Sequence, residues 1–539
     1  MDNNMQEEVF HKAKTRKILL SCLILALIGY GLFLRVYGLG EQSLWIDEGY
    51  TINASQAILE RGIPLLDSGK VYRGGLLTTY FTAGAMRALP FDPFSPWSAR
   101  LPSAFFGILT VIAASYLAHA LFRNYFITLG TLGIVTFSYW EIAWSRQARG
   151  YAALSFFTLL SLIFVWRFFK RREKSALILS FLAGLGAIYS QHLGALVFPA
   201  SFAAFCIAMF AQSNILSTVR KRTLTLIFCG VCLAAFAFFI IATRFTRLAP
   251  LGFEPEYLGF LFKNIGVFTI GSIIAALLTL FDAKRFTSVY MLFAASALPI
   301  LIVTLYSPVI QFRYLFPFFP LLIILTTYTV WRVTEITFRL LSKHSNILHL
   351  PAVRHGNVRM SYLAAGTIMI VLALPSLSFM PRTHYALEFG SPQPDFKTVL
   401  SIIKNDRDIG CPNRNDNGGD IRCPMIIISP YAHLHQIYLG EKGYWLPMSL
   451  SGKQNEIEKN KIETDAGVID SYVGAPVVRD LDHLQELLDT QSGFLIIDDM
   501  ARRRLKSEVA LIESNPRVRI TFKSKGDNLG SIWLYRFGN

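Results

Sequence analysis

Charged residues are scarce in this chain of 539 residues. Asp, Glu, Lys and Arg together make up 16% of the sequence, whereas hydrophobic residues make up 53% and aromatic residues 14%. A typical soluble protein has about 25% charged residues, so this chain has too little polar surface for a soluble protein of its length. The composition therefore excludes a soluble globular protein and indicates a membrane protein.

Cysteine is also rare, and the sequence has no internal repeat or low-complexity tract. The six cysteines have none of the spacings typical of metal sites. Cys411 and Cys423 flank a short segment rich in Asn, Asp and Gly, where they either form a disulfide or remain free thiols. The other four lie in or beside apolar runs and are interpreted as small core residues: Cys22, Cys206, Cys229 and Cys232.

Acidic residues are outnumbered by basic ones, 36 to 52, which gives a formal net charge of +16. Such an excess can indicate nucleic-acid binding. Most of it lies in short clusters between apolar runs, where the positive-inside rule for membrane proteins accounts for it. We therefore expect no nucleic-acid partner.

Long apolar runs dominate the first 380 residues. They match the roughly 17–25 residues that a helix needs to cross the hydrocarbon core of a bilayer, and short polar connections separate them. The runs lie near residues 18–36, 99–121, 126–143, 151–168, 176–191, 193–212, 224–242, 264–281, 288–306, 315–332 and 361–379. The sequence thus predicts about eleven transmembrane helices.

The basic clusters predict the orientation of these helices. Four basic residues precede the first run, so the N-terminus is expected to be cytoplasmic, and no signal-peptide cleavage site follows that run. The predicted parts are a cytoplasmic tail at 1–17, a transmembrane domain at 18–380 with an outward loop at 37–98, and an extracytoplasmic domain at 381–539. A multi-pass protein of the plasma membrane is expected.

The composition changes after about Pro381 to that of a soluble α/β domain. The segments "CPMIIISP" and "GFLIID" predict short buried strands, and "RVRITFKS" and "SIWLYRF" predict alternating strands near the end of the chain. The segments "HLQELLDT" and "RRRLKSEVALIES" predict amphipathic helices.

Two adjacent acids, Asp47 and Glu48, follow Trp45 in the first outward loop. An aromatic residue of this kind is typical of the membrane interface. Burial at that depth would raise the proton affinity of a carboxylate toward the range useful for a general base. The alternative is a solvated acid pair that marks the end of a helix, and spacing alone leaves both interpretations open.

Several basic residues lie on the same predicted outer side, which is normally depleted of Lys and Arg. They are Lys70, Arg73, Arg146, Arg149, Arg244, Arg247 and Arg313. Arginines at helix ends can hold a phosphate by paired hydrogen bonds, and a phosphate at this depth would belong to a lipid head group. The alternative for each of them is a side chain that snorkels toward ordinary lipids.

Five segments together resemble the integral-membrane GT-C glycosyltransferases. They are "LWIDEGYT" (44–51), "SARLPSAFFGILTV" (98–111), "SRQARGYAALSFF" (145–157), "YSQHLGAL" (189–196) and "RYLFPFFP" (313–320). Within that superfamily the chain is similar to the bacterial branch of the protein O-mannosyltransferase type, which includes the aminoarabinose and galacturonic acid transferases of lipid A. The resemblance implies a membrane all-α fold of about eleven helices with a C-terminal extracytoplasmic α/β domain.

The resemblance also implies an activity: inverting transfer of one sugar from a polyprenyl-phosphate carrier to an acceptor hydroxyl outside the membrane. Asp47 corresponds to the catalytic acid-base residue of the family, and Glu48 would orient the acceptor or the loop. Arg149 and Arg313 are the first candidates for binding the carrier phosphate, followed by Arg73 and Lys70. Where relatives often have Lys-Pro-Pro in this loop, the chain has "KVYRGG".

Further site candidates come from family-like positions. Tyr151, His192 and Tyr314 lie near the same predicted surface, although the structural interpretation of His192, as a hydrogen-bonded histidine, is the favoured one. Some related enzymes use a second acid, occasionally through a divalent metal, and Glu141 is the nearest candidate for it. Its neighbours Trp140 and Trp144 also fit an interface belt, so metal dependence stays open.

Two other classes of protein compete with a transferase. A polytopic transporter or lipid-linked-sugar flippase would place ionisable residues near the centre of its membrane helices, commonly within repeated halves. The apolar runs here have almost no charge at their centres. The other alternative is a non-catalytic envelope scaffold. The sequence identifies neither the sugar, the carrier length nor the acceptor, which can be lipid, glycan or protein.

Overall fold

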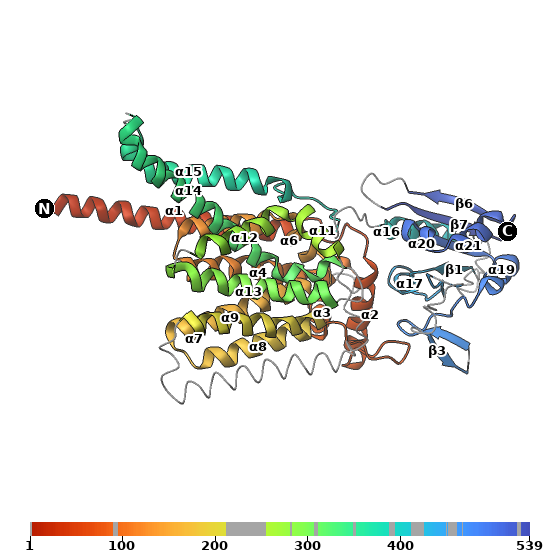
Figure 1. Ribbon diagram of the computed structural model, residues 1–539. Coiled ribbons are helices and arrows are strands. Elements are labelled where there is room, and N and C mark those ends of the chain that lie inside the picture. Colours follow the sequence, from red (N-terminus) through yellow and green to blue (C-terminus); the bar gives the residue numbers. More distant parts are fainter. Residues whose placement is uncertain are drawn as a thin grey trace. The chain divides into compact units, whose positions relative to one another are not determined.

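The computed structural model forms two compact units (Figure 1). It describes residues 3–89, 95–211, 255–280, 283–306, 311–348, 352–386, 394–410, 425–448, 450, 461–465, 467–524 and 530–538. Met1–Tyr37, Ser103–Arg146 and Gly150–Arg382 make up the first, here called the membrane unit. Gly38–Pro102, Gln147–Arg149 and Thr383–Asn539 make up the second, the α/β unit.

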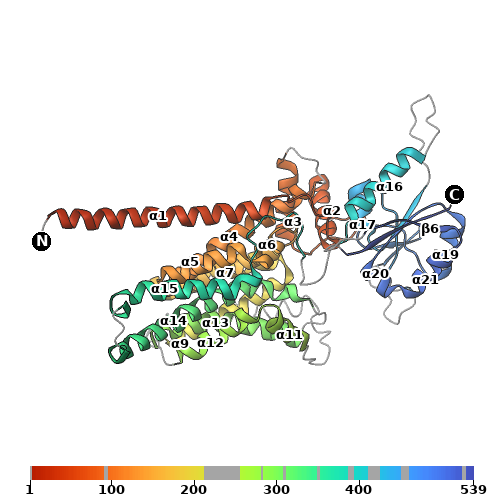
Figure 2. The ribbon, with the colours of Figure 1, turned by 90° about the horizontal axis from the view of Figure 1, so that it is seen from above.

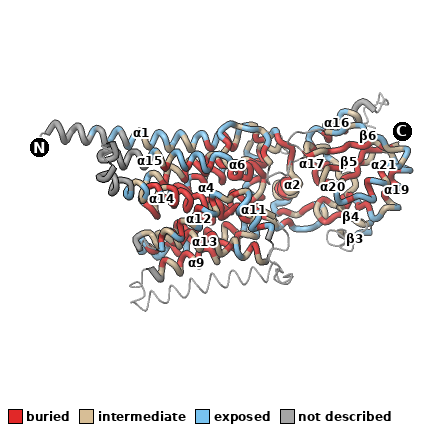
Figure 3. The backbone as a smooth tube through the Cα atoms, turned by 45° about the horizontal axis from the view of Figure 1, so that its top comes forward, coloured by how far each residue is buried: buried red, intermediate tan, exposed pale blue. Residues whose placement is uncertain are grey.

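The membrane unit is a bundle of helices whose buried faces pack against one another (Figures 1 and 3). Its described α-helices are α1 (Asn3–Val36), α4 (Pro96–Phe122, of which the start belongs to the α/β unit), α5 (Tyr125–Phe137), α6 (Tyr139–Ser145), α7 (Tyr151–Arg171), α8 (Ser175–Ser190), α9 (Val197–Ala211), α11 (Pro255–Lys263), α12 (Gly266–Thr279), α13 (Ala283–Tyr306), α14 (Phe319–Leu348) and α15 (Ala352–Ala373). Short 3₁₀ turns are η1 (His192–Leu196), η3 (Phe312–Tyr314), η4 (Phe316–Phe318) and η5 (Leu374–Ser376).

Six of the described helices are long and apolar enough to cross a membrane. They are Lys17–Val36, Pro96–Phe122, Tyr151–Arg171, His192–Met209, Arg285–Leu305 and Phe312–Leu340. A seventh span is possible if Glu256–Lys263 and Gly266–Thr279, which meet at a 90° bend, are counted as one. The structure therefore confirms a polytopic membrane protein but not the predicted number of eleven spans.

The difference arises where predicted runs are short or interrupted. The run at 126–143 is divided at Ser138 into α5 and α6, because Ser138 accepts a hydrogen bond from the backbone N–H of Glu141 and so starts a new helix. Tyr125–Phe137, Ser175–Ser190 and Leu363–Ser376 are apolar but shorter than a full span. The run at 224–242, which contains Cys229 and Cys232, lies outside the described residues. The same holds for Arg244 and Arg247, which follow it.

Buried arginines hold the end of α1 in the membrane unit. The last carbonyl groups of a helix have no partner within the helix. Arg146 Nη1 donates to the carbonyl oxygens of Leu34, Arg35 and Tyr37 at 3.3, 3.2 and 2.6 Å. Arg35 in turn donates to Ser145 Oγ at 3.3 Å and to the Thr136 carbonyl at 3.3 Å. Arg146, which the sequence offered as a phosphate ligand, thus binds the protein's own backbone.

The α/β unit contains a five-stranded mixed sheet with the strand order β2-β1-β5-β7-β6. Its strands are β1 (Ile426–Ser429), β2 (Tyr444–Trp445), β5 (Gly493–Asp498), β6 (Val518–Lys523) and β7 (Ile532–Phe537), and a separate hairpin is formed by β3 (Lys461–Thr464) and β4 (Gly467–Asp470). β1 pairs in parallel with β2 and β5, whereas β7 is antiparallel to both β5 and β6. The helices are α2 (Ile46–Arg61), α3 (Leu76–Ala88), α16 (Phe396–Gly410), α17 (Ala432–Leu439), α19 (Leu481–Thr490), α20 (Asp499–Arg504) and α21 (Lys506–Ser514).

Both faces of this sheet are covered, as Figure 2 shows for α17 and α19. Side chains alternate between the faces of a strand. Phe494 and Ile496 of β5 accordingly pack in one core cluster, with residues of α16 and α17, whereas Leu495 and Ile497 pack in another, with α19 and α21. This two-sided burial explains the uninterrupted apolar sequence of β5.

The segment predicted as the outward loop is largely helical and belongs to the α/β unit. Leu44, Ile52 and Met86 enter the same core cluster as the α16 and α17 side of the sheet. The predicted strands at "CPMIIISP", "GFLIID", "RVRITFKS" and "SIWLYRF" and the predicted helix at "HLQELLDT" are present. The segment "RRRLKSEVALIES" is helical but is interrupted at Leu505, which separates α20 from α21. Cys411 and Cys423 lie outside the described residues, so the question of a disulfide stays a prediction.

Candidate active site

The acid pair lies in the first turn of α2. Ile46 is the first helical residue, and the carboxylate of Glu48 accepts a hydrogen bond from the backbone N–H of Trp45 at 2.9 Å. This contact satisfies one of the backbone donors that the start of a helix leaves unpaired. Acidic residues at this end also complement the positive end of the helix dipole. Local helix chemistry therefore fixes the backbone of both acids.

Glu48 is completely buried and fully engaged within the α/β unit. Arg100 donates Nε to Glu48 Oε1 and Nη2 to Oε2, both at 2.8 Å, and the backbone N–H of Ala148 donates to Oε1 at 2.7 Å. Arg100 is also buried and donates to the carbonyl oxygens of Leu39, Gln42 and Ser43. Paired hydrogen bonds of this kind are the strongest form of an ion pair. Glu48 thereby links three separate segments of the chain.

Asp47 has a different environment. Its side chain is 23% exposed, and its Oδ2 lies 3.5 Å from Arg149 Nη2. Arg149 Nη1 also donates to the Asp47 carbonyl at 3.1 Å, to the Tyr72 hydroxyl at 2.9 Å and to Thr51 Oγ1 at 3.3 Å. The guanidinium is thus held in a fixed position beside a carboxylate that a substrate can still reach.

The two other basic candidates of this unit lie on the loop between α2 and α3. Lys70 Nζ donates to Ser471 Oγ at 3.2 Å and lies 4.6 Å from the centre of the Tyr472 ring. Arg73 is exposed and lies two residues before Gly75, the N-cap residue of α3. Lys70 is therefore tied to the C-terminal part of the chain, whereas Arg73 faces solvent.

A buried histidine from the C-terminal part of the chain, which sequence reasoning missed, binds the first turn of α2, where Asp47 and Glu48 lie. His433 Nε2 donates to the carbonyl oxygen of Ile46 at 2.9 Å, and its ring stacks on Tyr50 with 4.2 Å between centroids. Tyr50 also packs on Tyr472 at 4.3 Å. A Cβ atom at Gly49 would lie 2.4 Å from His433 Cδ2, so glycine permits this close approach. No local motif identifies such a partner.

Acidification is expected to destabilise the α/β unit through His433. Burial lowers the pKa of His433 to about 4, whereas an unfolded histidine has a pKa of about 6.5. The unfolded chain therefore binds the proton first, and the free energy of unfolding falls as the pH drops from about 6.5 to about 4, by up to about 3 kcal/mol. Thermal unfolding of the detergent-purified protein across this range measures the effect.

Two variants make this pH prediction specific. His433→Gln keeps a donor for the Ile46 carbonyl but has no titratable group, so the part of the pH dependence between 6.5 and 4.5 that comes from His433 should disappear. Burial also lowers the pKa of His483, which contributes in the same direction and should remain. His384→Gln changes an exposed histidine of the same unit and should leave that dependence unchanged. A pH dependence of unfolding that is identical in His433→Gln and wild type would contradict the assignment.

The remaining predicted residues belong to the membrane unit. Tyr151 starts α7 and packs edge-on against Trp144 at 4.8 Å, and the Arg313 guanidinium lies 5.9 Å from the Tyr151 ring. His192 is exposed at the start of η1, and Tyr314 follows Arg313 in η3. The structure thus brings Tyr151 and Arg313 together.

Glu141 is the second acid that the sequence proposed, and it is buried in α6. Neither carboxylate oxygen has a hydrogen-bond partner among the described residues, and Arg35 is the charged group that acts on it. Within the described part of the chain, no three His, Cys, Asp or Glu side chains lie close enough to hold a metal ion. Because Arg100 occupies the Glu48 carboxylate, the acid pair does not fit a metal site either.

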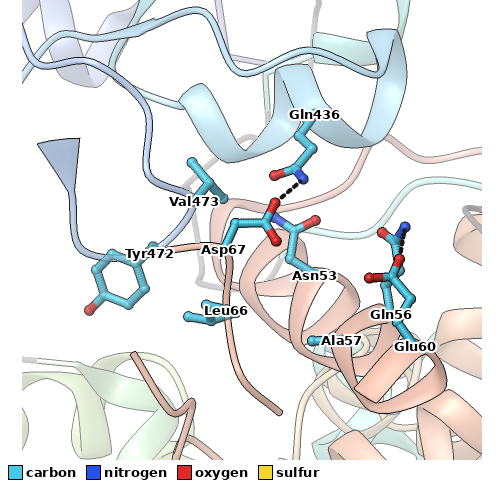
Figure 4. A pocket seen from close by; sticks show the side chains of 9 residues that line it. All are labelled: Asn53, Gln56, Ala57, Glu60, Leu66, Asp67, Gln436, Tyr472 and Val473. Carbon is cyan, nitrogen blue, oxygen red and sulfur yellow. Dashed lines mark hydrogen bonds between the residues drawn. The ribbon is translucent and has the colours of Figure 1, made fainter. Parts of the chain in front are cut away.

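A small pocket beside α2 contains Asn53, Gln56, Ala57, Glu60, Leu66, Asp67, Gln436, Tyr472 and Val473 (Figure 4). Its volume is only about 50 Å³. Its polar groups bind one another: Gln436 donates to Asp67 at 2.9 Å and Gln56 to Glu60 at 2.9 Å. We interpret these contacts as part of the attachment of α2 to α17 and not as a substrate site.

The fold is shared with solved membrane proteins. The chain has the fold of the ArnT protein from Cupriavidus metallidurans, with a TM-score of 0.54, 13% identity and coverage of 97% of this chain and 98% of that one. A second structure of that protein, bound to undecaprenyl phosphate, matches equally well. The archaeal oligosaccharyltransferase AglB from Archaeoglobus fulgidus, in complex with an inhibitory peptide and a dolichol-phosphate, matches with a TM-score of 0.55, 12% identity and coverage of 90% and 70%.

One family model matches a part of the chain. Residues 69–246 match the model described as dolichyl-phosphate-mannose-protein mannosyltransferase. No curated protein sequence matches the chain significantly. The family match and the shared fold confirm the resemblance to GT-C glycosyltransferases that the five sequence segments indicate.

Proposed function

We propose that the chain is an inverting glycosyltransferase that moves a single sugar from a polyprenyl-phosphate carrier to an acceptor hydroxyl. The observation that carries this proposal is the contrast between the two acids of α2. Glu48 is buried and paired, whereas Asp47 is fixed in position, partly exposed and next to a cation. A substrate-accessible carboxylate held on a rigid helix end is what a general base requires.

In the proposed reaction, Asp47 removes the proton of the acceptor hydroxyl as that oxygen attacks the anomeric carbon. The bond between the anomeric carbon and the carrier phosphate breaks at the same time, and attack from the opposite face inverts the configuration. Arg149 is well placed to stabilise the departing phosphate, because its guanidinium is already fixed beside Asp47. Arg313, Arg73 and Lys70 are further candidates for this phosphate. Glu48 acts as a positioning residue.

The donor class is supported by the related folds. ArnT has been solved with undecaprenyl phosphate and AglB with a dolichol-phosphate, both of which are polyprenyl-type phosphates. We propose a carrier of the same chemical class here. In keeping with the basic clusters between the apolar runs, we propose a cytoplasmic N-terminus in the plasma membrane and an extracytoplasmic α/β unit.

Mass spectrometry of envelope lipids, glycans and proteins tests the proposed function. Cells with the chain, cells without it and cells with only Asp47→Asn should be compared. One species should lose a single sugar in both altered strains. If no species changes, and polyprenyl-phosphate sugars do not accumulate, a transporter or a scaffold becomes the better interpretation.

Replacing Arg149 by alanine is expected to raise the carrier concentration needed for half-maximal transfer by roughly 10–100-fold, the effect of losing one or more charge-assisted hydrogen bonds. The maximal rate should also fall, because Arg149 holds Asp47. Initial rates at varied carrier concentration separate the two effects. Arg61→Ala removes an exposed guanidinium from the other end of α2 and should behave as wild type. An unchanged carrier dependence in a folded Arg149→Ala protein would leave Arg149 with a positioning role only.

A further inference from the structure

A second cavity of the α/β unit lies beside the first turn of α2 and shares Tyr472 with the pocket of Figure 4. It has a volume of about 170 Å³, and its lining includes Ile46, Tyr50, His433, Trp445, Tyr472 and Arg504. We call it the aromatic pocket. Pockets that enclose a drug-sized ligand have volumes of roughly 300–1,000 Å³, so this one fits a single small ring and not a chain of several sugars.

The indole of Trp445 is part of the lining of this pocket. The side chain is half-buried and packs against a small cluster of Ala432, Val473 and Ala475. Unlike Tyr50, whose ring is in contact with both His433 and Tyr472, Trp445 stacks on no other ring within the described residues. An aromatic face carries negative charge density and attracts the C–H groups of a saturated ring. Trp445 is therefore the aromatic surface available to a ligand.

The backbone holds these rings rigidly. Trp445 lies in β2, where its N–H donates to the Pro476 carbonyl at 2.8 Å and its carbonyl accepts from the N–H of Val478 at 2.9 Å. Asp470 accepts hydrogen bonds from the backbone N–H groups of Tyr472 and Ala475, both at 2.8 Å, and so shapes the turn that carries Tyr472. A preformed pocket loses little conformational entropy when it binds a ligand.

Two charged side chains line the aromatic pocket, Asp470 and the exposed Arg504. The Asp470 carboxylate is occupied by the backbone N–H groups of its own turn, so Arg504 is the charged group that a ligand can pair with. It is the last of three arginines in α20, and the other two are engaged: Arg502 pairs with Glu513 at 2.7 Å, and Arg503 donates to the Asp499 carbonyl at 3.1 Å. Arg504 has no hydrogen bond or ion pair with any residue that the structure describes. A guanidinium that lines a pocket without such a partner suits a carboxylate or a phosphate.

From this combination we infer that the aromatic pocket binds one acidic sugar residue of the acceptor, with the ring on Trp445 and its carboxylate or phosphate on Arg504. A lipid tail would leave the charge of Arg504 uncompensated, and a neutral sugar would not use it. That this sugar belongs to an acceptor rests on the proposed function. That the pocket binds an acidic sugar does not.

The aromatic pocket is directly connected to the proposed base. Tyr50 follows Asp47 by three residues in α2, so the two side chains lie on the same side of the helix, about 5–6 Å apart at Cβ. The Ile46 carbonyl, which precedes Asp47, accepts the hydrogen bond of His433. Tyr50 in the pocket wall is thus one helical turn from Asp47, and we propose that a neighbouring hydroxyl of the same acceptor reaches the carboxylate from there.

Saturation-transfer NMR on the full-length protein in lipid nanodiscs tests the inference without any transfer reaction. The probes are glucuronic acid, glucose 6-phosphate, glucose and N-acetylaspartate, each at millimolar concentration. Both acidic sugars should bind at least about tenfold more tightly than glucose, and the stronger of the two indicates whether the acceptor carries a carboxylate or a phosphate. Stronger binding of N-acetylaspartate would indicate a peptide and overturn the inference.

Variants locate the binding. Arg504→Gln should weaken the binding of the acidic sugars about tenfold and leave glucose unaffected, whereas Arg503→Gln, the adjacent matched control, should change neither. Trp445→Ala should abolish binding of all three sugars, and Trp445→Phe should restore part of it. Equal effects of the two arginine variants, or no saturation transfer from the protein to any sugar, would overturn the inference.

The Asp47→Asn variant separates this inference from the proposed function. It should bind the acidic sugars as wild type does, although its transfer is expected to be about 10²–10⁴-fold slower. If wild type binds no sugar but the envelope analysis still shows a lost sugar, the transferase proposal stands and the aromatic pocket is not its acceptor site. If sugars bind but no envelope species depends on the chain, the pocket stands and the transferase proposal fails.

Discussion

Asp47→Asn is expected to lower the rate of sugar transfer by about 10²–10⁴-fold, the usual contribution of a positioned general base. Asparagine has nearly the same shape and can still contact Arg149, but its amide cannot take a proton from an acceptor hydroxyl. The half-saturating carrier concentration should change little, because Arg149 and its contacts to Tyr72 and Thr51 remain. Transfer by purified protein with a defined carrier-linked sugar measures both quantities.

Two controls make the Asp47 experiment decisive. Asp482→Asn changes an acid in the first turn of another helix of the same unit, α19, and should leave transfer unchanged. The melting temperature of Asp47→Asn should match that of wild type within a few degrees, since the side chain is partly exposed and its ion pair is long. Transfer at the wild-type rate by the folded variant would remove Asp47 from the chemistry.

The sequence predicts well those features that local pattern determines. The strands at Ile426–Ser429 and Gly493–Asp498 are short apolar runs with turn residues beside them, and the amphipathic spacing of Leu481–Thr490 gives a helix. The acid pair could be identified from its place after a long apolar run and from its resemblance to known motifs. Counting spans is less secure, since a serine cap at Ser138 divides a run without any change in hydropathy.

Local sequence patterns do not predict the partners of the acid pair. Arg100 lies 52 residues from Glu48, and His433 lies 387 residues from Ile46. Arg100 lies in the family-like segment 98–111, but nothing in that segment indicates its pairing with Glu48. Pairing of this kind depends on the tertiary structure, which brings the α2 turn, the start of α4 and α17 into one core. Nothing in the residues around His433 distinguishes it from an ordinary surface histidine.

Helix geometry explains why two adjacent acids have different roles. Consecutive residues of an α-helix point about 100° apart, so the first turn of α2 cannot direct both carboxylates to the same place. Glu48 points inward to Arg100, and Asp47 points toward Arg149 and solvent. Glu48 therefore fixes the backbone of the helix turn that positions Asp47.

Breaking the buried pair is expected to destabilise the α/β unit by about 3–5 kcal/mol, since Glu48→Ala leaves the Arg100 charge buried and uncompensated. Arg100→Leu should cost as much, because it leaves the Glu48 carboxylate and the carbonyl groups of Leu39, Gln42 and Ser43 without their donor. The melting temperature should fall on the order of 10 °C in each variant. Limited proteolysis at 25 °C should then cleave the segment around α2 faster than in wild type.

The double variant Glu48→Leu/Arg100→Leu distinguishes a lost ion pair from a lost backbone anchor. Replacing a buried ion pair by apolar residues is often neutral in other proteins. Here the backbone N–H groups of Trp45 and Ala148 also lose their acceptor, so the double variant should recover only part of the lost stability. Glu48→Gln keeps the shape and should lose stability and transfer together. If it loses transfer at an unchanged melting temperature, Glu48 takes part in the reaction itself and is more than an anchor for Asp47.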